Sequence, residues 1–379
     1  MKESFILLEN WLLNSGIVES SNKLPNFGAV HSYYDINNNN FGFLYPEITG
    51  YFVDTMHFLY SMNKQEKYKQ FAEASSNWLI QIFEKFNGIV MGVENDQPTQ
   101  NLSFTFDTGI CSTAMFKCYE LTKNKKFLDF GLKLLDWINN GSIENDGTIL
   151  PYFNPEKQSF QESEQVWYKQ KGCLNIKTCI PFFRYYKISN SSDYLETGKR
   201  ICDSFSLFQR NDGSFSLHQN SSVTNLHTQC YALEGLLYGY FVTNDQKYLD
   251  ACEKALDWCV NNIEHDGSIR LWFENKYKSK ASYPIAQLIR LMILFDSVEN
   301  TSKYKTVIPK LMNFLLTFQA QSTNPHVNGG FFEEITKSIF GWKKNSKINS
   351  WGSMFSLQAL YWKENFSKIT FDDEVKLLF

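Results

Sequence analysis

The sequence predicts an all-α protein, folded as a closed ring of six helix pairs, and two observations carry this prediction. An aromatic residue followed ten positions later by a second one recurs along the chain, each time within an amphipathic segment. A second kind of segment, less charged and more apolar than the first, begins 17 to 21 residues before the first aromatic residue of each pair. Amphipathic helices that alternate with wholly apolar ones are expected when an outer ring of helices wraps an inner ring.

The amphipathic segments are the predicted outer helices. Their aromatic pairs are Tyr68/Trp78, Phe127/Trp137, Tyr248/Trp258 and Tyr304/Phe314, with a weaker copy at Tyr194, where Ser204 takes the second position. The two most similar copies read FLDFGLKLLDW and YLDACEKALDW. Turn signals follow four of these segments, at Asn87-Gly88, Asp146-Gly147, Asp212-Gly213 and Asp266-Gly267. We expect these glycines to end the outer helices and to start a short extended piece.

The apolar segments are the predicted inner helices. They read EITGYFVD from Glu47, DTGICSTA from Asp107, KTCIPFFR from Lys177, HTQCYALE from His227, YPIAQLIR from Tyr283 and WGSMFSLQ from Trp351. The last one has no full outer helix after it, whereas Met1–Trp11 carries a tryptophan at the matching position and ends at Asn14-Ser15-Gly16. We therefore expect the N-terminal helix to pack beside the last hairpin and to close the ring, with residues 1–379 forming one domain. The alternative is a linear stack, which exposes two apolar ends that need capping repeats.

Charge and composition exclude several classes of function. A net charge of −3 and a pI near 6.1 argue against nucleic acid as the main partner. Apolar runs such as Leu288–Phe295, which Arg290 interrupts, are too short for a membrane span. The eight cysteines lack a disulfide spacing and Met1–Asn14 lacks the layout of a signal peptide, so we expect a cytoplasmic protein. Oligomeric state is not encoded in any pattern of the chain.

No cofactor is expected. The sequence has neither of the glycine-rich loops that bind nucleotide phosphates, and no cysteine pair has the short spacing of a zinc site. Asp107, Cys111 and His227 could be combined into a zinc set of the kind found in protein prenyltransferases, but their spacing does not favour it.

Four motifs carry a resemblance to known proteins: YPEITGYF (45–52), FDTG (106–109), LHTQCYALEGLL (226–237) and INSWGSMFSLQAL (348–360). Together with the repeat, they resemble the (α/α)6 toroid proteins, in particular the six-hairpin glycosidase-like and prenyltransferase/squalene-cyclase-like proteins of bacterial surface-polysaccharide synthesis. The resemblance spans nearly the whole chain and implies a toroid with its site at the mouth of the ring. Toroids of this kind include hydrolases, lyases, epimerases and cyclases, so the fold alone does not select the reaction.

Aligning the inner helices gives three layers of side chains. The first holds Glu47, Asp107, Lys177, His227, Tyr283 and Trp351; the second holds Tyr51, Cys111, Pro181, Tyr231, Gln287 and Phe355; the third holds Asp54, Ala114, Arg184, Glu234, Arg290 and Gln358. Residues four and seven apart share a helix face. Because ionisable groups on apolar helices need partners, we expect this face to line the lumen.

The first layer predicts a substrate cup. Glu47 and Asp107 form the candidate acid/base pair, and His227 is a second proton carrier. Candidate substrate-binding residues are Tyr45, Tyr51, Lys177, Tyr231, Trp272, Tyr283, Gln287 and Trp351, with Lys177 as a clamp for a negative group and the aromatic rings as faces for sugars. The alternative is that Glu47, after Pro46, favours the helix dipole and that Asp107 is a cap.

The third layer predicts a structural network rather than catalysis. Asp54, Arg184, Glu234 and Arg290 comprise two charges of each sign and are expected to balance one another in the lumen. Glu333, in the loop before the last inner helix, is a weaker candidate for a carboxylate at the rim.

The leading functional hypothesis is a carbohydrate-active enzyme of glycan synthesis or remodelling, with a saccharide as its partner. Its reaction would be hydrolysis or lyase or epimerase chemistry. An isoprenoid toroid that binds a prenyl diphosphate or a polyprenyl-linked glycan is the second hypothesis, with Lys177, Arg184 and Arg290 reaching the phosphate. A non-catalytic glycan-binding scaffold is the third.

Overall fold

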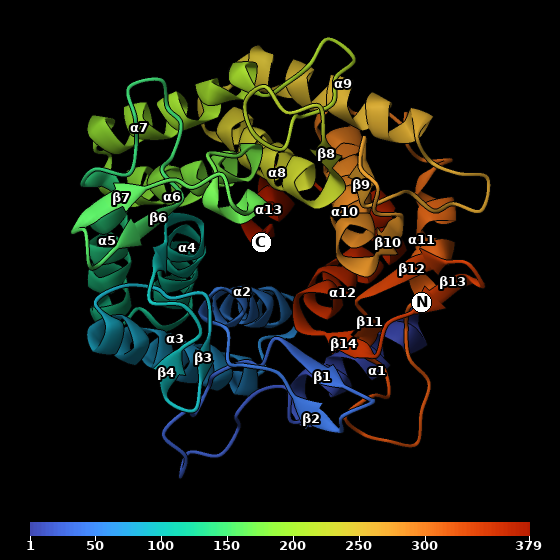
Figure 1. Cartoon of the computed structure of the whole chain (residues 1–379), viewed down its shortest axis with the longest axis horizontal. Helices are drawn as coiled ribbons and strands as arrows, with labels where there is room; N and C mark the ends of the chain where they lie inside the picture. The colour runs from blue at the N-terminus through green and yellow to red at the C-terminus, as the bar shows by residue number, and fades with distance from the viewer.

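The computed structural model describes residues 1–379, which form two concentric rings of helices (Figure 1). The inner ring consists of α2 (Pro46–Asn63), α4 (Thr105–Thr122), α6 (Cys179–Ser189), α8 (Leu226–Thr243), α10 (Ser282–Val298) and α12 (Ser350–Glu364). The outer ring consists of α1 (Lys2–Asn14), α3 (Glu66–Phe86), α5 (Lys125–Asn139), α7 (Ser192–Asp203), α9 (Gln246–Asn261) and α11 (Ile308–Leu316). The predicted toroid of six helical hairpins is confirmed.

Burial explains the two kinds of helix. In the inner helix α8, 13 of 18 residues are buried, whereas in its outer partner α9 only 7 of 16 are buried. Inner helices contact neighbours on most sides, and outer helices turn one face to water. Hydrophobic residues from both rings join in one core cluster of 95 side chains. None of the helices combines the length and apolarity that a membrane-spanning segment needs.

The N-terminal helix closes the ring. The indole nitrogen of Trp11 donates a hydrogen bond of 2.9 Å to the carbonyl of His326, and the Gln319 amide donates one of 2.8 Å to the carbonyl of Ser4. α1 thus lies beside α12 and next to the segment after α11, as Figure 1 also shows. The expected closure is confirmed, and a linear stack of helix pairs is excluded.

Three of the four turn glycines join neighbouring outer helices, a role different from the expected one, whereas Gly88 approaches Ser103 in β5. At Gly147, Gly213 and Gly267 φ is +83°, +92° and +82°, and an added Cβ would lie within 2.0–2.4 Å of a carbonyl oxygen in the next outer helix. The expectation that these glycines end the helices is wrong: α9, for example, ends at Asn261, and at α3 the left-handed Asn87 ends the helix. The DG turns instead let two backbones approach closely.

We predict that Gly267→Ala lowers the free energy of unfolding by about 1–3 kcal/mol, because a Cβ there combines a positive φ with a 2.4 Å approach to the carbonyl oxygen of Lys310. Gly341→Ala is the matched control, since Gly341 has φ +106° but nothing within 4 Å of the added atom. Urea unfolding of both variants separates contact from backbone strain. Equal losses would show that the approach to α11 contributes nothing.

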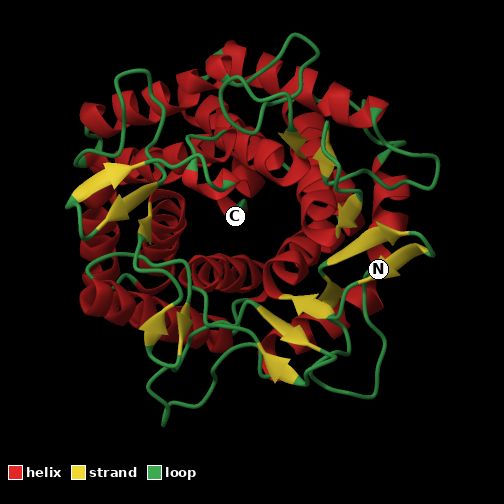
Figure 2. Cartoon of the chain, in the orientation of Figure 1, coloured by secondary structure: helices red, strands yellow, loops and turns green.

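Short strands lie on one rim of the ring, the side nearest the viewer in Figure 2. They are β1 (Tyr33–Asp35), β2 (Asn40–Phe41), β3 (Val93–Glu94), β4 (Gln97–Pro98), β5 (Ser103–Phe104), β6 (Tyr152–Asn154), β7 (Ser159–Gln161), β8 (Thr224–Asn225), β9 (Trp272–Phe273), β10 (Ser279–Ala281), β11 (Phe331–Phe332), β12 (Glu334–Ser338), β13 (Gly341–Lys344) and β14 (Lys347–Asn349). They pair antiparallel as β11-β14-β1-β2, β10-β12-β13, β3-β4, β5-β6-β7 and β8-β9. Four of them lead directly into inner helices α4, α8, α10 and α12, so the N-termini of these helices face this rim.

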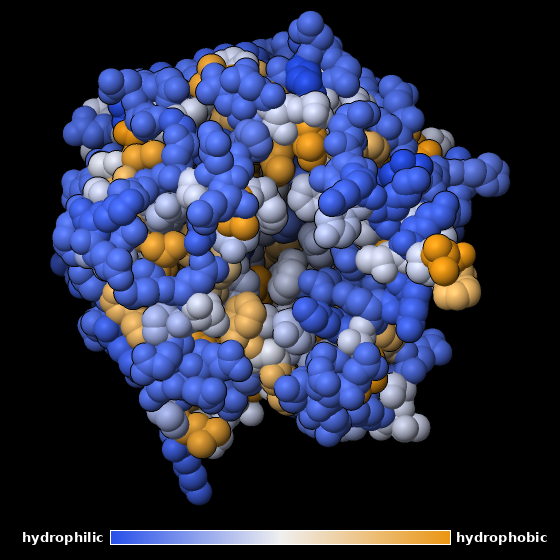
Figure 3. Space-filling model, viewed as in Figure 1, coloured by the Kyte–Doolittle hydropathy of each residue, from blue (hydrophilic) through white to orange (hydrophobic).

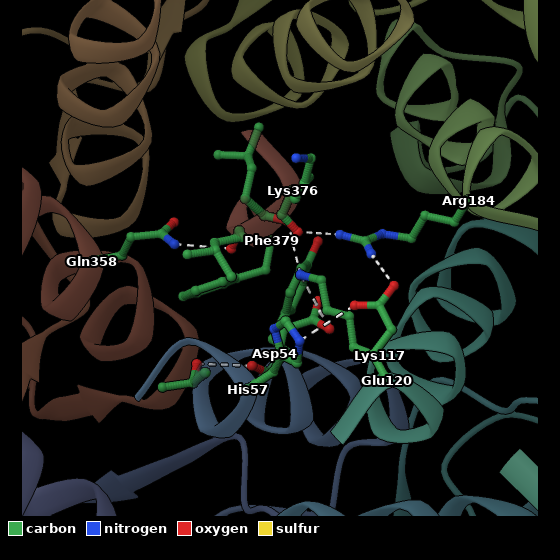
Figure 4. Close-up of polar contacts among 12 residues, drawn as sticks. Asp54, His57, Lys117, Glu120, Arg184, Gln358, Lys376 and Phe379 are labelled. Carbon is green, nitrogen blue, oxygen red and sulfur yellow. Dashed lines mark hydrogen bonds and ion pairs between the residues drawn. The ribbon is translucent and has the colours of Figure 1, made fainter. Parts of the chain in front are cut away.

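The last residues of the chain fill the opposite end of the lumen. The short helices α13 (Phe371–Glu374) and η5 (Val375–Leu377) lead into a segment that lies among the inner helices (Figure 4). Its carbonyls accept hydrogen bonds of 2.9 Å each from side chains of the inner ring: Leu377 from Gln358, Leu378 from Lys117 and Phe379 from Arg290. This C-terminal plug leaves the strand-bearing rim as the open mouth.

Candidate active site

A cavity of about 280 Å³ lies at the mouth, between the N-terminal ends of the inner helices. Its position corresponds to the central hollow of the surface in Figure 3. It is lined by Tyr45, Glu47, Ile48, Met91, Phe104, Phe106, Asp107, Pro151, Trp167, Tyr168, Leu174, Asn175, His227, Tyr231, Tyr283 and Trp351. The volume is close to the lower end of the roughly 300–1,000 Å³ typical of small-ligand sites, and the walls are apolar with a few polar groups. Each of the six hairpins contributes to the wall.

Two buried carboxyl groups face this cavity. Glu47 is the second residue of α2 and Asp107 the third of α4. Burial raises the pKa of Glu47 to about 7, opposed by the hydroxyls of Tyr45 and Tyr231 and the charge of Lys177. Burial, and then the charge of Glu47, raise the pKa of Asp107 well above its usual value. Because burial opposes two negative charges in one cavity, the pair shares one proton near neutral pH, an arrangement that provides one acid and one base.

Neither carboxylate is the cap of its helix. The N-cap positions are Tyr45 and Phe104, and neither side chain makes a capping hydrogen bond. One oxygen of Asp107, Oδ2, is buried without a hydrogen-bond partner in the protein. Buried polar atoms are nearly always paired, so this oxygen is available to a bound ligand. The positive end of the helix dipole still favours charge at both positions.

His227 faces the cavity from the first turn of α8. Its Nδ1 lies 2.5 Å from the amide oxygen of Gln287. Because that oxygen can only accept, Nδ1 carries the proton and Nε2 keeps a lone pair. Burial lowers the pKa of His227 to about 3, despite the opposing bond to Gln287, so the ring is neutral at physiological pH. It packs 4.2 Å from the ring of Tyr231 and 4.5 Å from that of Tyr283, between centroids.

The third hairpin presents Asn175, which the sequence alignment missed, in place of Lys177. The chain enters α6 through a 3-10 helix, η2 (Cys173–Thr178), and both side-chain polar atoms of Asn175 are buried without a partner in the protein. A 3-10 helix rises about 2.0 Å per residue, against 1.5 Å for an α-helix, so residues along η2 lie deeper than an α-helical register predicts. Asn175 is therefore the polar group available to a ligand.

Lys177 is not a clamp at the mouth. Its Nζ donates hydrogen bonds to Glu234 at 2.7 Å and to the hydroxyl of Tyr51 at 3.2 Å. It also lies over the rings of Tyr51 and Tyr231, at 4.7 and 4.6 Å from their centroids. Because this ammonium is buried and already bonded to Glu234 and Tyr51, Lys177 is not free to bind a negative group of a ligand.

The other expected binding residues divide into two groups. Tyr45, Tyr231, Tyr283 and Trp351 line the cavity. Tyr51 and Gln287 are fully buried behind the wall, and Trp272 lies outside it, in β9, with its ring 6.3 Å from that of Trp167. Glu333 accepts a hydrogen bond of 2.8 Å from Asn345 and does not line the cavity.

Several lining residues come from loops and were not predicted. Trp167 and Tyr168 belong to the short helix η1 (Trp167–Lys169) in the connection from β7 to η2, and Met91 precedes β3. These connections have no counterpart in the repeat. Their richness in aromatic residues (VWY at 166–168) is the one signal that could have marked them.

Below the cavity, the charged side chains form two separate clusters instead of the single network expected of Asp54, Arg184, Glu234 and Arg290. In the upper cluster, Glu234 lies 2.7 Å from Lys177 and 2.6 Å from Arg290, and it also accepts a hydrogen bond from Gln287. All four side chains are buried. This cluster connects the second-layer residue Gln287, and through it His227, to the charged interior.

The lower cluster, shown in Figure 4, surrounds the plug. Asp54 pairs with Lys117 at 3.4 Å, while Glu120 pairs with Arg184 at 3.2 Å and with His57 at 3.3 Å. The expectation that Asp54 and Arg184 balance Glu234 and Arg290 is therefore wrong. Asp54 and Arg184 instead pair with Lys117 and Glu120, which α4 presents deeper in the ring. Burial lowers the pKa of Lys117 to about 7.

Comparison with known proteins supports the fold. No family model matches the chain, and no curated protein is similar to it in sequence. Among solved structures, it is similar to cellobiose 2-epimerase from Bacillus thermoamylovorans B4167 (TM-score 0.76, 13% identity, 97% of this chain and 100% of the other). It is also similar to a D-mannose isomerase (0.77, 11%, 96% and 98%) and to an unsaturated glucuronyl hydrolase specific for heparin (0.71, 15%, 98% and 98%). The chain therefore has the (α/α)6 toroid fold that these sugar epimerase, isomerase and hydrolase structures share.

Proposed function

We propose that this protein is a carbohydrate-active enzyme that performs acid–base chemistry on a saccharide held in the mouth of the ring. The observation that carries the proposal is the pair of buried carboxyl groups, Glu47 and Asp107, with raised pKa values in one aromatic-lined cavity. Aromatic faces suit the apolar faces of sugar rings, and paired carboxyl groups of different pKa suit proton transfer at neutral pH. The fold shared with sugar-processing enzymes supports the same conclusion.

The favoured reaction is hydrolysis of a glycosidic bond. Protonated Asp107 donates its proton to the glycosidic oxygen as the bond from that oxygen to the anomeric carbon breaks. Ionised Glu47 takes a proton from the water whose oxygen forms the new bond to that carbon. His227, through Nε2, and Asn175 bind hydroxyl groups of the sugar. No lysine or arginine lines the cavity, which favours a neutral saccharide over a uronic acid.

A sugar epimerase or isomerase is the second candidate, and His227 favours it. A neutral imidazole with a free Nε2 can remove a proton from a carbon next to a carbonyl, and a carboxylic acid can supply one. Turnover in deuterium oxide distinguishes the two reactions. Epimerisation places deuterium on carbon, whereas hydrolysis leaves every carbon-bound hydrogen in place.

The isoprenoid hypothesis has less support. It requires cations that reach a phosphate, but Lys177 and Arg290 are paired with Glu234, and Arg184 with Glu120. A binding scaffold without catalysis is left as an outcome of the assays.

A thermal-shift screen tests the proposal first. The panel contains neutral disaccharides and oligosaccharides, uronic-acid oligosaccharides and prenyl diphosphates, and each stabilising sugar is then incubated with enzyme and its products are followed by NMR. A ligand at a hundredfold its dissociation constant adds about 2.7 kcal/mol of stability. We expect stabilisation and turnover with a neutral saccharide. Stabilisation without any product would favour a scaffold, and stabilisation by prenyl diphosphates alone would contradict the proposal.

We further predict that kcat/KM rises with pH through an apparent pKa of about 7. Below that value both carboxyl groups are protonated and no base is present, and above it Glu47 is ionised while Asp107 keeps its proton. The rate falls again at higher pH, when Asp107 ionises. A pH–rate profile checks this, and residual activity of Glu47→Gln is expected to lack the rising limb. A rate that declines from pH 5 to 8 would reverse the two roles.

A further inference from the structure

The hairpin formed by β12 and β13 carries an exposed apolar tip. Its two turn residues, Ile339 and Phe340, are 93% and 94% exposed, and Trp342 on the returning strand is 41% exposed. Tyr277, 65% exposed, precedes β10, the strand that pairs with β12. These are four of the nine exposed large hydrophobic residues of the chain, gathered on one small sheet. Such a concentration marks an interaction site.

The same sheet is basic. Segments 275–281 and 334–349, which cover β10, β12 and β13, contain seven lysines and a single acidic residue, Glu334, the first residue of β12, although the whole chain has a net charge of −3. The lysines are Lys276, Lys278, Lys280, Lys337, Lys343, Lys344 and Lys347. Lys280 is buried and paired with Glu264 and Asp266, whereas none of the other six forms a salt bridge. Lys344 donates a hydrogen bond of 2.6 Å to the carbonyl of Thr317, and Lys347 lies 4.1 Å from the centroid of the Tyr33 ring. The charges free to meet an external partner are therefore those of Lys276, Lys278, Lys337 and Lys343.

Strand register surrounds the tip with these charges. Lys337 lies opposite Trp342, and Lys343 lies opposite Thr336, so successive lysines extend from both faces of the hairpin. The hairpin projects from the edge of the molecule on the mouth side, where Figure 3 shows apolar atoms at the right margin beside hydrophilic ones. The result is an apolar wedge with a collar of positive charge, which we call the basic hairpin.

We propose that the basic hairpin docks the protein onto an anionic lipid surface. Ile339 and Phe340 enter the boundary between headgroups and acyl chains, Trp342 lies at the headgroup level, and the unpaired lysines contact lipid phosphates. Charge complementarity selects this partner: every charged side chain between Ile335 and Asn349 is a lysine, and a flat anionic surface contacts lysines on both faces of a wedge at once. This inference is independent of the reaction at the mouth.

Co-sedimentation with vesicles tests the proposal on the full-length protein. We expect binding to vesicles that contain phosphatidylglycerol and at least tenfold weaker binding to pure phosphatidylcholine vesicles. Ile339→Ser/Phe340→Ser should weaken binding to the anionic vesicles by at least tenfold, because two nearly fully exposed apolar side chains are lost. Lys337→Gln/Lys343→Gln should weaken it by about fivefold per lysine, and added salt should weaken it further.

Ile6→Ser/Leu24→Ser is the matched control, since both residues are exposed hydrophobics outside the basic hairpin, and it should bind like the unmodified protein. The tip variants should keep their melting temperature, because an added atom at Gly341 meets nothing within 4 Å and the tip packs on no neighbour. Failure of the unmodified protein to bind anionic vesicles overturns the proposal, as does binding that the tip variants leave unchanged. A dimer in solution that the tip variants dissociate, without vesicle binding, would identify a second copy as the partner instead.

Discussion

Replacing Glu47 with glutamine is expected to lower kcat/KM on the saccharide substrate by about 10²–10⁴-fold, the usual contribution of a positioned acid or base. Asp107→Asn should have an effect of similar size. Both substitutions keep the shape of the side chain while removing its ability to exchange a proton, and Glu47→Gln also removes a charge that is costly to bury. Stability should therefore be kept or increased while the rate falls.

Glu333→Gln is the matched control for these two variants. Glu333 is also a carboxyl group at the mouth side of the ring whose pKa burial raises, but it is bonded to Asn345 and does not line the cavity. Its substitution should leave kcat/KM within about threefold, since it removes no proton carrier from the site. If Glu47→Gln and Asp107→Asn each lose less than tenfold, the assignment of the acid/base pair is wrong.

Replacing Glu234 with glutamine is expected to destabilise the fold by about 3–5 kcal/mol, the largest effect on stability predicted for any single side chain here. Glu234 is the shared counter-charge of Lys177 and Arg290, at 2.7 and 2.6 Å, and all three are buried. Glutamine still accepts hydrogen bonds but leaves two cations unneutralised in a medium where their charge is poorly solvated. Urea-induced unfolding gives the value.

Glu196→Gln is the comparison for this second prediction. Glu196 pairs with Lys199 at 3.0 Å on the exposed side of α7, and exposed pairs contribute about 0–1 kcal/mol. A loss below 1 kcal/mol in Glu234→Gln would mean that Lys177 or Arg290 finds another partner or loses its proton. A second substitution, of Lys177 by Met in the Glu234→Gln background, would then restore little.

The fold could be predicted from the sequence because the repeat expresses a simple physical requirement. A helix with neighbours on most sides must be apolar all round, and a helix with one wet face must be amphipathic, so the two classes of segment identified the two rings. The tryptophan of Met1–Trp11 predicted ring closure because it marked this segment as an outer helix without an inner partner of its own. In the structure Trp11 is buried, and its indole donates a hydrogen bond to the carbonyl of His326.

The site was less predictable, because a shift of a few ångströms along an inner helix decides which side chain reaches the cavity. Glu47, Asp107 and His227 begin α-helices, and the alignment placed them at the cavity. Lys177 lies in η2, whose steeper rise breaks the α-helical register, and Asn175 takes its place. Lys117 and Glu120 were missed because the alignment stopped above them, and Trp167 because loops follow no repeat.

The closure of the ring by α1 also matters while the chain is being synthesised. The bond from Trp11 to His326 joins residues 315 positions apart, and at about 5–20 residues per second the ribosome needs roughly 15–60 seconds to add that length. During this time the apolar face of α1, with Leu8, Trp11 and Leu12, has no final partner. The contacts that join the two ends of the helix ring have a high entropic cost of loop closure and are therefore expected to form late. Nascent chains are therefore expected to need protection by chaperones until translation has passed α12.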